Sequence, residues 1–176
     1  MAEDRNKFLN DSGKAGLILG GVAIAYFLIE ILLGKINLGF LGGLIGVVLW
    51  AGKLILCVWL LHSFLKKYAA SCDNDRSRTF RYGMTVAFCS ALVYAGFCFA
   101  YVQFIQPDFY EQTFQQVAQA YSSMLTSDQM DQILNMESSM PRLSFFANLI
   151  WCTLFGTIVS AISSNRICNP GNPFED

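Results

Sequence analysis

Charged side chains are scarce in this 176-residue sequence. Only 14% of the residues are charged and 54% are hydrophobic, whereas a soluble domain carries about 25% charged residues. So little charge excludes an ordinary soluble domain. The composition therefore predicts a membrane protein, and we expect no nucleic-acid partner.

Residues that carry catalytic or metal chemistry are also few. The only histidine is His62, and the six cysteines form no C-x-x-C motif, so no metal-ligand set is present. Phosphate-binding loops and G-x-S-x-G motifs are missing as well. Asp73 and Asp75 have D-x-D spacing, but their context, SCDNDRSR, is typical of a solvated turn. We expect no enzyme activity, no cofactor, no metal and no disulfide.

Long apolar runs, by contrast, are abundant. About 20 apolar residues suffice to cross a hydrocarbon layer of roughly 30 Å. Four runs predict transmembrane helices, at residues 15–34, 38–65, 82–105 and 143–163. We therefore predict an all-α polytopic membrane protein, with residues 1–176 forming a single membrane domain and an extracytoplasmic helical hairpin between the third and fourth helices.

Lysine and arginine are distributed unevenly around these spans. One side of the membrane holds only Lys35 and Arg142. Because basic residues concentrate on the cytoplasmic side, we predict cytoplasmic N and C termini and an external segment 106–142. The other side, predicted to be cytoplasmic, holds nine basic residues: Arg5, Lys7, Lys14, Lys66, Lys67, Arg76, Arg78, Arg81 and Arg166.

One lysine, Lys53, lies in the middle of the second span. A charge at that depth costs about 2.5 to 3.5 kcal/mol on insertion scales, so Lys53 needs a partner inside the protein. Helical geometry places it on one face with Gly39, Gly42 and Gly46, which predicts a close contact with another helix. With the midpoints of the spans aligned, Tyr94 and Thr153 lie at the depth of Lys53, and Glu30 and Asn148 lie roughly 8 Å nearer the outer face. The predicted buried polar or ligand site combines this lysine with Glu30, Tyr94, Asn148 and Thr153.

The segment between the last two spans, the outer arm 106–142, is amphipathic. Pro107 can open a first helix, which is predicted to continue from the third span. The apolar residues of this arm helix recur at helical spacing from Phe114 to Leu125. Thr126 and Gln129 form a capping box that predicts a second helix. Methionine suits an adaptable protein surface. The predicted partner-binding residues at the arm tip are Met124, Leu125 and Met130.

Several stretches together resemble one family. They are the RYG that opens the third span, YVQFIQPDF at its outer end, the acidic Gln- and Met-rich arm, and GTIVSAISSNRI in the fourth span. In these features nearly the whole chain resembles the bacterial inner-membrane family known as domain of unknown function 4199. The resemblance implies four membrane helices without an assigned activity. Members often accompany genes of membrane glycosyltransferases, which implies an accessory role in envelope glycolipid assembly.

Two functional hypotheses follow from these features. We expect a non-enzymatic accessory or scaffold protein that acts through its helix faces and outer arm, with membrane lipid and a membrane-protein partner or second copy. The alternative is a carrier of lipid or small solutes that uses Lys53 and Glu30 as its polar site. A third possibility is an enzyme that uses a buried carboxylate, and the presence of Glu30 is the only feature that supports it. A polar path to Lys53 would favour the carrier, whereas a dry, packed centre would favour the scaffold.

Overall fold

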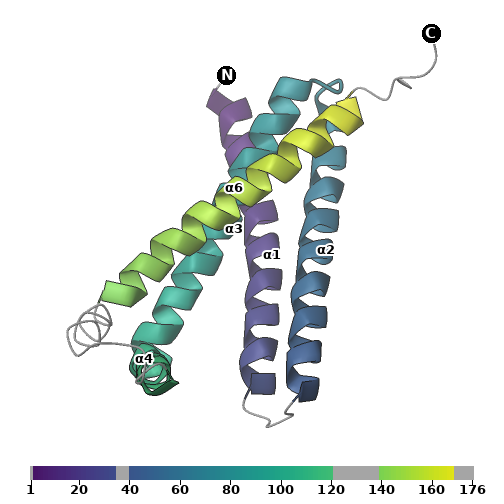
Figure 1. Ribbon diagram of the computed structural model, residues 1–176. Coiled ribbons are helices and arrows are strands. Elements are labelled where there is room, and N and C mark those ends of the chain that lie inside the picture. The colour runs from purple at the N-terminus through teal and green to yellow at the C-terminus, as the bar shows by residue number, and fades with distance from the viewer. Residues whose placement is uncertain (1, 35–39, 121–138, 169–176) are drawn as a thin grey trace.

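The computed structural model describes residues 2–34, 40–120 and 139–168, which are almost entirely helical. Four of the helices are long and apolar enough to cross a membrane, so the all-α, polytopic prediction is confirmed (Figure 1). The second arm helix, together with Met124, Leu125 and Met130, lies outside the described residues. The elements are α1 (Ala2–Gly34), α2 (Phe40–Ser71), α3 (Arg76–Ala100), the π-helix η1 (Tyr101–Ile105), α4 (Phe109–Ala120) and α6 (Met140–Cys168).

The long helices extend beyond the predicted spans. In particular, α1 begins at Ala2 instead of residue 15, and α2 continues to Ser71. Apolar composition marks only the part of a helix that can lie in lipid, whereas the helix itself continues until its backbone is interrupted. For α2, the interruption comes at Asp73 and Asn74, whose φ angles of 52° and 56° are left-handed.

The connection between α2 and α3 is an exposed turn, as its sequence predicts. Asp75 caps α3 by accepting hydrogen bonds from the backbone N–H groups of Ser77 and Arg78, at 2.9 and 3.3 Å. Its carboxylate also lies 3.4 Å from Arg78 Nε. We call this end of the bundle, marked by residues 72–75, the basic end, and the opposite end, marked by η1 and α4, the arm end.

The central helix is α3, which packs against α1, α2 and α6. In Figure 1, α1 and α2 run side by side, while α6 crosses α3 obliquely. Glycine allows these helices to approach closely. A Cβ atom added at Gly16 of α1 would lie 2.5 Å from Cys89 Cβ, and one added at Gly156 of α6 would lie 2.5 Å from Ala87 Cβ.

The packed core lies toward the basic end. Tyr82 stacks on Tyr68 with ring centroids 4.1 Å apart, and Phe8 meets both rings edge-on. Leu65 and Val86 are fully buried beside this cluster. Toward the arm end, by contrast, α3 and α6 diverge from α1 and α2 (Figure 1). The helices therefore pack closely toward the basic end and spread apart toward the arm end.

The predicted close contact at the glycines of α2 is wrong at Gly46. A Cβ atom added there would have no atom within 4 Å, because α2 lies at the edge of the bundle and much of its surface faces outward. Gly39 lies outside the described residues, as do the side-chain surroundings of Gly42. A glycine pattern predicts where a helix could approach closely, but it does not predict that a partner covers that face.

The sequence predicts that the first arm helix continues from the third span, and this prediction is wrong. Gln106 breaks the helix with φ −137° and ψ 69°, because the ring of Pro107 disfavours helical geometry in the residue before it. The last turn before this break is the π-helix η1, and α4 starts only at Phe109. The break redirects α4 away from the axis of α3 (Figure 1).

Candidate ligand-binding cavity

Lys53 has the polar partner that its depth predicts. Its ammonium group donates a hydrogen bond to Tyr94 Oη at 3.3 Å and lies 4.6 Å from the centre of the same ring. The tyrosine therefore provides both a hydrogen-bond acceptor and a cation–π contact, which can be worth about 2 kcal/mol when desolvated. Among the described residues, no ion pair joins Lys53 to Glu30.

Thr153 does not take part in this contact. Its hydroxyl donates to the backbone oxygen of Leu149 at 2.6 Å, and Thr157 and Ser160 bond the preceding turn of α6 in the same way. Such back-bonding is usual for hydroxyl residues in helices. The hydroxyl groups of these three residues of α6 therefore find their acceptors within their own helix.

A cavity of about 500 Å³ lies at the arm end, bounded by α1, α3, η1, α4 and α6. This volume is within the range of small-molecule sites, about 300 to 1,000 Å³. Three residues of the predicted site line it: Glu30, Tyr94 and Asn148. Lys53 is not a lining residue, but it contacts the wall through Tyr94. Thr153 is not part of the lining.

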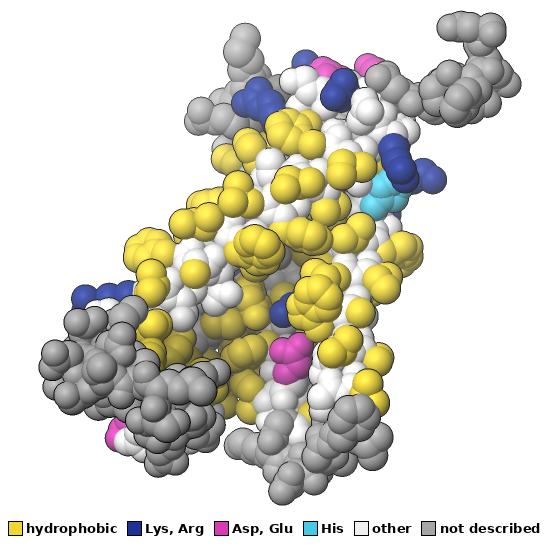
Figure 2. All heavy atoms as spheres, viewed as in Figure 1, with side chains coloured by type: hydrophobic (Ala, Val, Ile, Leu, Met, Phe, Trp, Pro, Cys, Tyr) yellow, Lys and Arg dark blue, Asp and Glu magenta, His cyan; other side chains and the backbone are white. Residues whose placement is uncertain are grey.

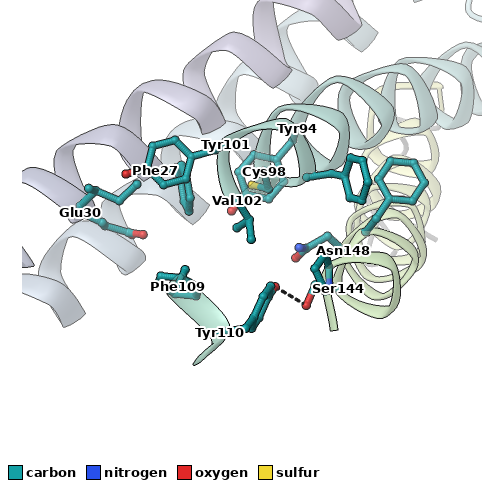
Figure 3. A pocket seen from close by; sticks show the side chains of 14 residues that line it. Phe27, Glu30, Tyr94, Cys98, Tyr101, Val102, Phe109, Tyr110, Ser144 and Asn148 are labelled. Carbon is teal, nitrogen blue, oxygen red and sulfur yellow. Dashed lines mark hydrogen bonds between the residues drawn. The ribbon is translucent and has the colours of Figure 1, made fainter. Parts of the chain in front are cut away.

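The arm supplies part of the cavity wall. Tyr110 of α4 donates a hydrogen bond to Ser144 Oγ of α6 at 2.6 Å (Figure 3). Tyr101 of η1 donates to Gln106 Oε1 at 3.3 Å. The first contact joins residues 34 positions apart. Because π-helical turns are rare and are frequent at functional sites, η1 is notable as the segment that turns the chain from α3 into this wall.

Aromatic rings form much of the remaining lining. Phe27 of α1 meets Tyr94, Phe97 and Tyr101 edge-on, with centroid distances of 6.3, 6.2 and 5.5 Å. Phe109 of α4 lies on another side of the cavity (Figure 3). These contacts hold Phe27 in place, so the cavity combines a stiff aromatic wall with separated polar groups.

The cavity opens on the side of the molecule. Figure 2 shows a hollow between α6 and the α1–α2 pair, with a basic and an acidic group visible in it. Glu30, which is half-buried, lies near the end of α1, only one helical turn from Leu33. Its carboxyl group is therefore close to the end of the membrane span, whereas Lys53 lies deeper.

Sequence reasoning missed Phe27, Tyr110 and Ser144. Tyr110 follows YVQFIQPDF directly, and the unusual density of aromatic residues there was the available signal. No local pattern paired Tyr110 with Ser144, because the contact depends on the direction that α4 takes after Pro107. Within the described ranges, no group of three or more His, Cys, Asp or Glu side chains could hold a metal ion.

These observations define a class of helical protein. Within the described ranges, four helices are able to span a membrane, and an aromatic-lined cavity with a few polar groups opens sideways. A family model described as "Protein of unknown function (DUF4199)" matches residues 14–167. The chain belongs to this family, as its motifs predict. Neither the curated proteins nor the solved structures contain a match to it.

Two motifs that carry the family resemblance meet in the core. Gly83 of RYG faces Ser160 of GTIVSAISSNRI, and a Cβ atom added at Gly83 would lie 2.5 Å from Ser160 Oγ. Tyr82 of the same motif forms the stacked pair with Tyr68. These motifs therefore determine how α3 packs against α6 and α2 at the basic end.

Proposed function

We propose that this protein is a non-enzymatic binding protein of the bacterial inner membrane, which takes the polar head of an amphiphile into the arm-end cavity. The observation that carries the proposal is the lateral cavity, which brings Glu30 and Asn148 together with the Tyr94 partner of Lys53. A scaffold that acts only through its outer helix faces would have a packed centre along its whole length.

The lining favours a headgroup that donates hydrogen bonds. A carboxylate only accepts hydrogen bonds, and the amide of Asn148 can both accept and donate. The aromatic walls suit either a sugar ring or an ammonium group, since cations are attracted to aromatic faces. The acyl chains of such a ligand would remain in the surrounding lipid, beside the sideways opening.

A glycolipid is the ligand that accords with the accessory role implied by the family resemblance, because a sugar head carries many hydroxyl donors. In this role the protein would hold the lipid for a membrane-protein partner or a second copy. The distribution of lysine and arginine supports cytoplasmic termini, and with this orientation the arm-end cavity would face the outer leaflet.

Lipid analysis of the purified protein tests this proposal. Wild-type protein and the variants Glu30→Gln and Asn148→Leu would be isolated in mild detergent, and the lipids that remain bound would be identified by mass spectrometry. The matched control is Trp151→Leu. Trp151 lies on α6, as Asn148 does, but it is 72% exposed and does not line the cavity.

We expect one amphiphile class to be enriched on the wild type and on the control and to be depleted on both cavity variants. Loss of a hydrogen bond to a charged group costs about 1.5 to 3 kcal/mol, so retention should fall at least tenfold on Glu30→Gln. A hydrogen bond to a neutral amide is worth about 0.5 to 1.5 kcal/mol, so the fall on Asn148→Leu should be smaller, about twofold to tenfold. Equal lipid content in all four proteins, or none above the detergent background, would contradict the proposal.

A further inference from the structure

A second hollow lies toward the basic end, between α2 and α6. Its volume is about 560 Å³, and it shares no lining residue with the arm-end cavity. The walls are apolar and come from both helices. They include Ile55 and Val58 of α2 and Val159 and Ile162 of α6.

The polar residues of this groove lie at one end of it. His62 follows Ile55 by seven residues on α2, so the groove runs about 10 Å along the helix axis from apolar wall to imidazole. Arg166 lies in the last turn of α6 and also lines the groove. The groove therefore has an apolar length and a basic end.

Other residues strengthen this polarity. Lys66 lies one helical turn beyond His62 on the same face of α2, and it is exposed. Figure 2 shows the histidine, in cyan, beside dark blue basic side chains at this end. Trp59, which also lines the groove and is 62% exposed, has the amphipathic ring typical of the membrane–water interface.

We propose that this groove binds an anionic phospholipid. The phosphate lies against Arg166 and His62, and one acyl chain follows the apolar wall formed by Val58, Val159 and Ile162. Basic pockets between transmembrane helices on the cytoplasmic side recognise anionic headgroups in this way. The charge distribution supports the same leaflet, because the nine basic residues of the predicted cytoplasmic side flank this end of the helices.

Lipid binding to the intact protein tests the proposal. Wild-type protein in detergent would be titrated with phosphatidylglycerol or phosphatidylcholine, and bound lipid would be counted by native mass spectrometry. Arg166→Gln removes the charge at the groove. Arg142→Gln is the matched control, because it removes the same charge from the opposite end of the same helix.

We expect the wild type to prefer phosphatidylglycerol, and Arg166→Gln to weaken that binding about fivefold, the effect of roughly 1 kcal/mol per basic residue. Arg142→Gln should leave the preference unchanged. Equal effects of the two substitutions, or equal binding of the two lipids by the wild type, would overturn the proposal.

A second pair of variants tests the apolar wall. Ile162→Trp fills the groove at a residue that is 55% exposed, whereas Ile158→Trp adds the same ring at a 59% exposed residue of α6 outside the groove. Only Ile162→Trp should reduce phosphatidylglycerol binding. If both variants bind like the wild type, or if inorganic phosphate displaces the lipid, the groove is not a site for a phospholipid chain.

Discussion

Gly83→Ala adds a single methyl group at the crossing of α3 with α2 and α6. The new Cβ atom would lie 2.5 Å from Ser160 Oγ, 2.7 Å from Ser160 Cβ and 2.8 Å from Leu65 Cδ2. Neither neighbour can move easily. Ser160 is fully buried and its hydroxyl is held by a 2.7 Å hydrogen bond to the backbone oxygen of Gly156, and Leu65 is fully buried in the core.

The size of the effect follows from a comparison within α3. Gly96→Ala is the control, because a Cβ atom there would have no neighbour within 4 Å. Both substitutions gain about 1 kcal/mol of helix propensity, so this contribution cancels in the comparison. Overpacking a filled core costs about 1 to 3 kcal/mol. We expect Gly83→Ala to be less stable than Gly96→Ala by that amount.

Thermal unfolding in one detergent, followed by circular dichroism, measures this difference. Ser160→Gly should rescue part of the loss in the Gly83→Ala background, because it removes the nearest clashing atoms, and this coupling identifies the contact. The reasoning would be refuted if Gly83→Ala unfolded at the same temperature as Gly96→Ala or above it, or if Ser160→Gly gave no rescue.

Three further predictions concern the remaining features. Tyr94→Phe removes the hydrogen-bond acceptor of Lys53 but keeps the ring, and should lower the free energy of unfolding by about 1 kcal/mol. This loss should vanish in a Lys53→Met background. An undiminished loss in that background would mean that the hydrogen bond is not its cause. Asp75→Ala removes the N-cap of α3 and should lower the free energy of unfolding by about 1 kcal/mol, a loss that Asp75→Asn should largely avoid. Equal melting temperatures of the wild type and Asp75→Ala would contradict the capping role. In a cysteine-free variant, a cysteine at Gln119 should react with an impermeant thiol reagent added outside the cell, while one at Ser77 should not, and the reverse pattern would overturn the predicted orientation.

Features that depend on composition and depth could be predicted from the sequence. The four apolar runs predicted the four long helices, because the cost of charge in lipid acts on every residue of a span. Matching residues by depth also named Tyr94 as a partner of Lys53. In both cases the relevant quantity, apolar length or distance along a helix, can be read directly from residue positions.

Features that depend on which helix faces meet could not be predicted in this way. Gly46 of α2 looks as suited to a close contact as Gly16 of α1, yet a Cβ atom at Gly46 would have no neighbour within 4 Å, whereas one at Gly16 would meet α3. Thr153 has the right depth to meet Lys53, but its hydroxyl finds an acceptor within its own helix. The cavity itself depends on the break before Pro107, which brings Tyr110 to Ser144.

The close packing toward the basic end explains how the arm end can carry polar groups. Tyr68, Tyr82 and the glycine contacts join the helices at the basic end, so the fold does not need a dry core along its whole length. Glu30 and Asn148 line a cavity that this packing leaves open. In lipid-free protein, substitutions at these two residues should therefore leave the unfolding temperature unchanged although they lower ligand retention, whereas Gly83→Ala should unfold at a lower temperature than Gly96→Ala. The separation of these effects distinguishes a binding site from a packing defect.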